Sequence, residues 1–184
     1  MAFPTVEELA QLIAPAVDPR GLDVEEIKVT RAGKKSVVAI RLDSDARPTL
    51  DEIEEVATDV SELFDAAEAS GSANFGAGYT LEVSTPGVDL PLTASRHWRR
   101  NRHRLVKVDG AHVWRIGALN DDETSVILIA HGRKKPGGED VVEKRLSDVD
   151  SAVVEIEFNN PPAAELELSG LSYAEATKWR EDNK

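Results

Sequence analysis

Hydrophobic residues recur every three or four positions in two segments of the first 84 residues, and this spacing predicts two helices. One helix begins after Thr5, and Pro15 and Pro19 are expected to close it. The other begins after Thr49, and its apolar stripe comprises Ile53, Val56, Ala57, Val60, Leu63, Phe64 and Ala67. Glu8 and Glu52 each lie three residues beyond a threonine, which is the spacing of a capping box at a helix start.

Three other segments of this half have the apolar–polar alternation of strands, and they are residues 22–31, 36–42 and 79–84. A break in the alternation at Glu25 and Glu26 predicts a β-bulge. Residues 70–78 are rich in Gly and Ser and predict a flexible loop. The resulting order indicates a small mixed sheet with helices on one side, an α-β-β-α-β sandwich.

The second half contains short apolar segments separated by turn residues, which is typical of a small β-barrel. The expected strands are residues 105–108, 113–119, 124–130, 141–146 and 152–158. Ser147 is expected to cap a tight turn before the last strand, as in the 3₁₀ turn of SH3-like barrels. Within the basic stretch 93–104, a short helical turn capped by Ser95 would bury Trp98 and leave the arginines outward.

These patterns predict an α+β fold with two domains, an N-terminal α-β-β-α-β sandwich and a C-terminal SH3-like small β-barrel. The expected parts are an acidic α/β domain at residues 1–84, a linker at 85–91, a barrel domain at 92–158 and an extension at 159–184. We expect this extension to be partly disordered or to form a short helix. Pro86, Gly87 and Pro91 in the linker predict a hinge, because proline stiffens the chain and glycine permits a turn.

Charge is distributed in agreement with this division. The chain has 184 residues and a formal net charge of −12. Residues 1–84 hold 7 basic and 17 acidic residues, whereas residues 85–160 hold 12 of each. The acidity argues against a chain that binds nucleic acid with its whole surface, but it leaves local contacts open in the neutral half.

Several classes of protein are excluded by what the chain lacks. No apolar run approaches the ~20 residues that span a bilayer, and the N-terminus lacks the pattern of a secretory signal. There is no Cys, so a disulfide framework and a thiolate nucleophile are absent. We therefore expect a cytoplasmic protein that does not associate with membranes.

Catalytic patterns are absent as well. The sequence contains no nucleotide-binding, hydrolase or zinc-protease motif, and its four histidines lack metal-ligand spacing. We therefore expect no catalytic residue, no cofactor and no metal site, and we expect a binding protein rather than an enzyme.

Basic residues form two clusters in the second half, one after Thr93 and one on a loop near Pro136. They are open to two interpretations, contacts with RNA phosphates or a solvated surface whose charges discourage edge pairing. The candidates for RNA contact are Arg96, Arg99, Arg100, Arg102, Lys107, Arg133, Lys134 and Lys135.

Acidic residues line the polar face of the second predicted helix. This face either keeps the protein in solution or steers it toward a basic partner. The candidates for contact with a basic protein are Glu54, Glu55 and Asp59 on this helix, and Asp121, Asp122 and Glu123 on a turn of the second half.

Residues 79–92 read Tyr-Thr-Leu-Glu-Val-Ser-Thr-Pro-Gly-Val-Asp-Leu-Pro-Leu. This segment resembles the interdomain motif of the bacterial ribosome maturation factor RimP family, in which a strand LEVSSPG is followed by a D-R-P-L linker. The resemblance extends over residues 5–158 and includes Gly21–Val24 and the aromatic-basic segment 97–108. Leu90 stands where the family has its linker arginine, so a contact of that arginine is not carried over.

The resemblance implies a non-enzymatic cytoplasmic factor that binds the free small (30S) ribosomal subunit and assists its late maturation through ribosomal protein and rRNA contacts. It implies small-subunit ribosomal protein number twelve, a basic protein, as a partner. It also implies the α/β domain and the SH3-like barrel, and we expect a monomer. The basic segment around Trp98 leaves an alternative open, an RNA-binding translational regulator that acts outside the ribosome.

Overall fold

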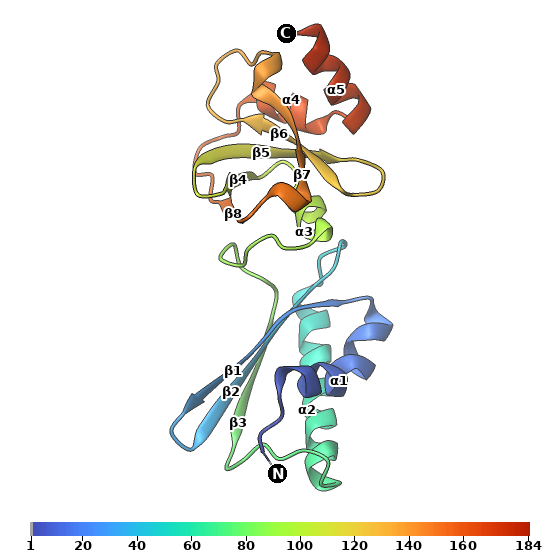
Figure 1. The fold of residues 1–184 in the computed structure, drawn as a ribbon. Helices are drawn as coiled ribbons and strands as arrows, with labels where there is room; N and C mark the ends of the chain where they lie inside the picture. Colours follow the sequence, from blue (N-terminus) through green and yellow to red (C-terminus); the bar gives the residue numbers. More distant parts are fainter. Residues whose placement is uncertain (1) are drawn as a thin grey trace. The chain divides into compact units, whose positions relative to one another are not determined.

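The computed structural model describes residues 2–184, and the chain divides into two compact units, one ending at Pro86 and the other running from Gly87 to Lys184 (Figure 1). Helices and strands occur in both units, which confirms the predicted α+β class. Among the described residues, no helix combines the length and the apolar composition needed to cross a bilayer.

The first unit is a three-stranded sheet with two helices on one face (Figure 1). Its elements are α1 (Val6–Val17), a 3₁₀ turn (Asp18–Arg20), β1 (Asp23–Ala32), β2 (Lys35–Asp43), α2 (Leu50–Ala69) and β3 (Tyr79–Ser84). The sheet order is β1-β2-β3, with β1 antiparallel and β3 parallel to β2. This is the predicted element order, and the register shift between Val24 and Glu26 confirms the predicted bulge.

The helix starts follow from local hydrogen bonds. The Thr5 hydroxyl accepts the backbone N–H of Glu8 at 3.2 Å, and the Glu8 carboxylate accepts the N–H of Thr5 at 3.2 Å, so the first capping box is confirmed. The Thr49 hydroxyl accepts the N–H of Glu52 at 3.1 Å. The helix α1 continues through Pro15 and ends at Val17, between the two prolines that were predicted to close it.

Apolar side chains of α1 and α2 pack on the sheet and form the core of the first unit. Leu9, Ile13, Val56, Val60 and Phe64 are fully buried, and they belong to the same cluster as the inward residues of β2. The stripe predicted for α2 therefore faces the sheet, and its acidic residues face solvent.

The Gly/Ser-rich loop at residues 70–78 is anchored rather than uniformly flexible. Phe75 is only 1% exposed, and its ring stacks on Phe64 with centroids 4.7 Å apart. The ring centroid of Tyr79 lies 4.9 Å from that of Phe75. The ring of Phe3 meets the Phe75 ring edge-on, with centroids 5.6 Å apart. The composition of the loop concealed this anchor, because one buried aromatic ring outweighs the flexibility of its small neighbours.

The second unit is a five-stranded antiparallel sheet with helices on both sides (Figure 1). Its elements are α3 (Ser95–Arg100), β4 (Leu105–Val108), β5 (His112–Leu119), β6 (Ser125–Ala130), β7 (Val141–Arg145), β8 (Ala152–Glu155), α4 (Ala163–Gly170) and α5 (Tyr173–Asp182). Two 3₁₀ turns lie at Gly138–Asp140 and Leu146–Asp148.

The strand order is β7-β6-β5-β4-β8, which leaves β7 and β8 as the two edges of an open sheet. Closure into an SH3-like barrel therefore stays a prediction. The expected 3₁₀ turn before the last strand is present, but Ser147 lies inside it and makes no capping hydrogen bond. The last strand ends at Glu155, three residues before the predicted end.

The helix α3 begins differently from the prediction. Ser95 is the first residue of the helix and not its cap. The ring nitrogen Nδ1 of His97 instead accepts the backbone N–H groups of Thr93 at 2.9 Å and Ala94 at 3.0 Å. The predicted burial of Trp98 is correct, since 3% of this residue is exposed.

The C-terminal segment forms two helices rather than a disordered tail or one short helix. Figure 1 shows α4 and α5 on the side of the sheet opposite to α3. They cover Ile127, Ile129 and Val141, which are at most 1% exposed. Ser172 caps α5 with a complete capping box, as its spacing to Glu175 predicts.

A buried charged group also fixes the first of these helices, α4. Arg115 on β5 is fully buried, and its Nε donates to Oε1 of Glu165 on α4 at 3.0 Å. Its two terminal nitrogens donate to the Glu157 carboxylate at 3.0 Å and 2.6 Å. Glu165 is itself fully buried and lies 2.9 Å from Nδ1 of His131. Each buried charge therefore has an opposite charge within hydrogen-bond distance.

Burial alone would disfavour the charged form of Arg115 and lower its pKa. The hydrogen bonds and the attraction of Glu157 and Glu165 outweigh this effect, so the pKa of Arg115 lies above its usual value. The hydrogen bond from Arg115 in turn lowers the pKa of Glu157. Arg115 and Glu157 are therefore charged at neutral pH.

Replacing Arg115 with leucine should lower the free energy of unfolding of the second unit by about 3–5 kcal/mol, because Glu165 then stays buried without its guanidinium partner. All three tryptophans, at positions 98, 114 and 179, lie in this unit, so urea unfolding followed by tryptophan fluorescence isolates its stability. Lys178→Leu is the matched control. Its ion pair with Asp182 joins side chains that are 79% and 61% exposed, and we expect a loss below about 1 kcal/mol. Equal losses of unfolding free energy in both variants would contradict the stabilising role of the buried Arg115.

Candidate functional site

One basic residue of α3, Arg99, contacts an acidic residue of the same unit. Arg99 forms an ion pair with Glu123, with one nitrogen–oxygen distance of 2.7 Å, and Ser95 donates to the same carboxylate at 3.3 Å. The sequence had assigned Arg99 to RNA and Glu123 to a basic protein. The structure brings these two candidates together, so neither charge is presented alone. Arg96 and Arg100 are half-buried on the same helix.

Arg102 holds the C-terminal helices in place. Its guanidinium donates to the carbonyl oxygen of Ser169 at 2.9 Å and to that of Leu171 at 2.8 Å, at the end of α4. Cations are favourable at this end of a helix because its last carbonyl groups lack intrahelical partners. Next to it, Nδ1 of His103 lies 2.8 Å from the Ser169 hydroxyl. Burial, with repulsion from Arg102 and Arg115, lowers the pKa of His103.

The other basic candidates lie on β4 and on the loop between β6 and β7. Lys107 is exposed on β4, where its register partners are Val113 and Val153. Arg133 lies 3.1 Å from Asp140, and Lys134 and Lys135 follow it on the exposed part of the loop. The two lysines and Lys107 are the candidates that are exposed and for which the described residues provide no ion pair.

The acidic candidates fall into two places. Glu54 and Glu55 are exposed on α2, whereas Asp59 is half-buried and pairs with Arg20 at 2.7 Å. Asp121 and Asp122 are exposed on the turn between β5 and β6. The Thr124 hydroxyl donates to Asp122 at 2.7 Å, and this bond lowers the pKa of the carboxyl group.

The linker residues Pro86, Gly87 and Pro91 lie where the chain passes from one unit to the next. Gly87 and Pro91 are exposed, and Pro86 is half-buried. Farther on, the Leu92 N–H donates to the Ala152 carbonyl at 2.8 Å, so the chain is tied to the second unit from this residue onward. The hinge candidates Gly87 and Pro91 therefore lie before the first residue that is hydrogen-bonded to β8.

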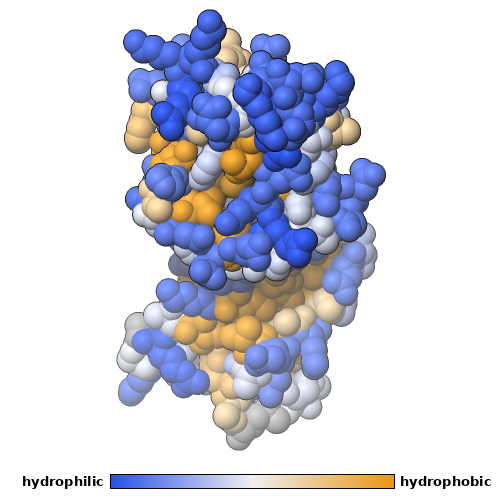
Figure 2. Space-filling view, turned by 45° about the horizontal axis from the view of Figure 1, so that its top comes forward, coloured by the Kyte–Doolittle hydropathy of each residue, from blue (hydrophilic) through white to orange (hydrophobic). Residues whose placement is uncertain are grey.

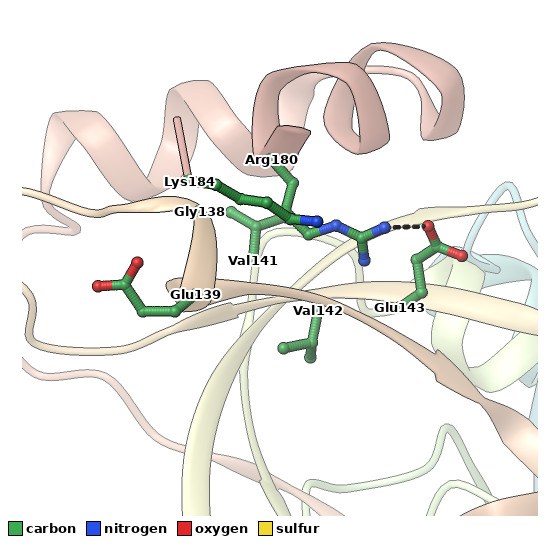
Figure 3. A pocket seen from close by; sticks show the side chains of 7 residues that line it. All are labelled: Gly138, Glu139, Val141, Val142, Glu143, Arg180 and Lys184. Carbon is green, nitrogen blue, oxygen red and sulfur yellow. Dashed lines mark hydrogen bonds and ion pairs between the residues drawn. The ribbon is translucent and has the colours of Figure 1, made fainter. Parts of the chain in front are cut away.

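A hollow of about 550 Å³ lies between β7 and α5 (Figure 3). It is lined by Gly138, Glu139, Val141, Val142, Glu143, Arg180 and Lys184. Arg180 reaches across it to Glu143 at 2.9 Å, so its most prominent cation is engaged within the protein. Within residues 2–184, no group of three or more His, Cys, Asp or Glu is arranged to hold a metal ion.

Comparison with known proteins covers the whole chain. The family model described as RimP N-terminal domain matches residues 12–89. A ribosome maturation factor RimP of Corynebacterium diphtheriae is 53% identical over the full length of both chains. The chain belongs to the RimP family. The RimP of Corynebacterium aurimucosum is 54% identical over 92% of each chain, and that of Mycobacteroides abscessus is 36% identical over 92% of this chain and 90% of its own. The resemblance read from the sequence is confirmed.

The cluster of Arg115, Glu157, Glu165 and His131 was not found from the sequence. These residues are up to 50 positions apart, and each is an ordinary charged residue in its local segment. The one signal was Arg115 itself, which stands in an otherwise apolar strand from Val113 to Leu119. A charge in such a run must find a partner if the strand is covered on that side.

Releasing Arg99 from its acidic partner should strengthen RNA binding. In Glu123→Gln the Arg99 guanidinium loses its ion pair with this carboxylate, and we expect the affinity for short RNA at low salt to rise several-fold. Asp121→Asn is the matched control, because it removes the same charge from the same turn without freeing an arginine. Fluorescence anisotropy with a labelled oligonucleotide measures both. Equal increases in RNA affinity in the two variants would show that the loss of one negative charge, and not the loss of the Arg99 ion pair, strengthens binding.

Proposed function

We propose that this protein binds the free 30S ribosomal subunit in the cytoplasm and assists its late maturation without catalysing a reaction. The observation that carries the proposal is the match over the full chain length to relatives named ribosome maturation factor. The distribution of charge supports it, since a particle made of RNA and basic protein offers partners for a basic and an acidic surface.

The RNA-facing surface in this proposal is the loop tip at Lys134 and Lys135 with Lys107 on β4. These lysines are exposed and have no ion pair among the described residues, so they can approach phosphate without breaking an internal contact. Arg96 and Arg100 remain candidates, and Arg99 and Arg133 contribute once they leave their acidic partners. Arg102 instead positions α4, so its loss acts on RNA binding through the fold.

The protein-facing surface is the acidic side of α2, with Glu54 and Glu55 exposed, and the turn at Asp121 and Asp122. The first unit carries a net charge of −10, with 7 basic and 17 acidic residues up to Pro86. A basic ribosomal protein, for which small-subunit ribosomal protein number twelve is the candidate, would be attracted by this field. Such attraction raises the association rate more than the final affinity.

The linker gives the two surfaces a way to engage the same particle. Pro86 and Pro91 stiffen the segment, and Gly87 permits a turn between them. Acting as a hinge, this segment lets one unit adjust while the other stays bound. Linked binding of this kind strengthens the overall complex through a high effective concentration of the second unit.

The purified protein should co-sediment with isolated 30S subunits in a sucrose gradient and should be absent from the 70S fraction of the same experiment. Free subunits expose surfaces that the assembled ribosome buries, which is the physical reason for the difference. Equal recovery with both particles, or with neither, would contradict the proposed function.

Replacing Lys134 and Lys135 with alanine should weaken binding to 30S subunits and reduce the slope of log affinity against log salt by about two, roughly one per phosphate contact. Lys28→Ala with Lys34→Ala is the matched control, because it removes the same charge from exposed positions of the first unit. An unchanged slope would show that Lys134 and Lys135 do not contact RNA phosphates. Tight binding of the wild-type protein to short RNA without ribosomal protein would favour the translational regulator instead.

A further inference from the structure

One aromatic side chain of the second unit is exposed to an unusual degree. The chain contains 3 Trp, 2 Tyr and 4 Phe, and eight of these nine residues are buried or half-buried. Phe158 is 90% exposed, and the nearby Ile156 is 58% exposed. Figure 2 shows that apolar areas interrupt the hydrophilic surface on the visible face of each unit. A single exposed aliphatic residue is ordinary, but an exposed phenylalanine beside an exposed isoleucine resembles the anchor of a binding surface.

The segment that carries Phe158 is fixed to the sheet. Glu157 lies between the two exposed apolar residues, and its carboxylate accepts two hydrogen bonds from the buried Arg115, at 3.0 Å and 2.6 Å. The side chain of Glu157 is only 18% exposed. Phe158 and Ile156 are therefore exposed on an anchored segment, and a partner that covers them has little chain entropy to overcome.

The same segment continues from a strand edge. β8 pairs with β4 alone, and the N–H of Asp109 donates to the carbonyl of Ser151 at 2.8 Å. Because successive residues of a strand direct their backbone groups to opposite sides, those of Ala152 and Val154 point away from β4. Leu92 donates to the carbonyl of Ala152, and no described residue continues the ladder at Val154. The edge is thus open where it leads into Ile156 and Phe158.

The charge of this surface indicates the chemistry of its partner. Residues 146–160 contain Asp148, Asp150, Glu155 and Glu157 and no Lys or Arg. Asp148, Asp150 and Glu155 are exposed, and Glu157 is engaged with Arg115. Lys107 of the neighbouring β4 lies opposite Val153, but the three exposed carboxylates outnumber it along this segment. Lysine and arginine side chains of a protein are therefore attracted here more strongly than RNA phosphates.

We propose that the β8 edge and Phe158 bind an extended, basic polypeptide segment carried by a protein of the 30S subunit. The segment adds to the sheet at Val154, its apolar side chain packs on Phe158 and Ile156, and its basic residues face Asp148, Asp150 and Glu155. Main-chain pairing supplies affinity and the apolar contact supplies specificity in this mode of recognition. The inference rests on the proposed function and assigns it a protein-binding surface separate from α2.

Photo-cross-linking tests which partner covers this position. Phe158 is replaced with p-benzoylphenylalanine in the full-length protein, the variant is irradiated with purified 30S subunits, and the cross-linked species are identified by mass spectrometry. We expect one dominant cross-link to a lysine- and arginine-rich segment of a ribosomal protein. A dominant cross-link to rRNA, to a second copy of the chain or to the first unit of the same chain would overturn the proposal, and so would the absence of a product.

Affinity measurements separate this inference from the proposed function. Phe158→Ala should weaken binding to 30S subunits about tenfold, as the truncation of an anchor residue does. Val6→Ala is the matched control, because Val6 is a 44% exposed apolar residue of α1, outside both proposed surfaces, and we expect its affinity to equal that of the wild type. An unchanged thermal transition in tryptophan fluorescence shows that Phe158→Ala still folds. If the wild type binds and both variants bind equally well, the inference alone fails; if the wild type does not bind, the proposed function fails with it.

Discussion

Arg115 lies fully buried within the sheet of the second unit, and the structure around it is arranged to neutralise its charge. A guanidinium has five N–H donors in fixed directions, so its partners must come from several directions at once. Glu165 arrives on α4, Glu157 on the segment after β8, and the backbone carbonyl of His103 on the turn before β4, at 2.7 Å. Three segments far apart in the sequence are thereby fixed to one strand.

The same constraint links stability to binding. Glu157 ties down the segment that presents Ile156 and Phe158, and Glu165 ties down α4, whose C-terminal carbonyls receive Arg102. One of the basic residues that composition assigned to RNA is therefore part of the fold. Ion pairs engage Arg99 and Arg133 as well, so exposed and unpaired basic charge is confined to fewer positions than the sequence indicates.

Much of the fold could be predicted because its signals are local. The apolar stripe after Thr49, the capping boxes at Thr5 and Ser172 and the bulge at Glu25 each depend on residues within a few positions of one another. Two of the predictions that were wrong depend on contacts that the local pattern does not show. At α3 the histidine ring reaches the free N–H groups in place of Ser95, and Phe75 anchors a loop whose composition suggests flexibility.

By itself the sequence determined the α+β class, the order of the elements, the segregation of charge and the membership in the RimP family, because these depend on short-range patterns and on the motif at residues 79–92. Tertiary structure alone decided which charges are available to a partner. Opposite charges such as Arg99 and Glu123, or Arg115 and Glu165, lie 24 and 50 positions apart and meet only when the chain folds. Once they meet, Coulomb attraction and desolvation, rather than composition, determine which side chains remain for binding.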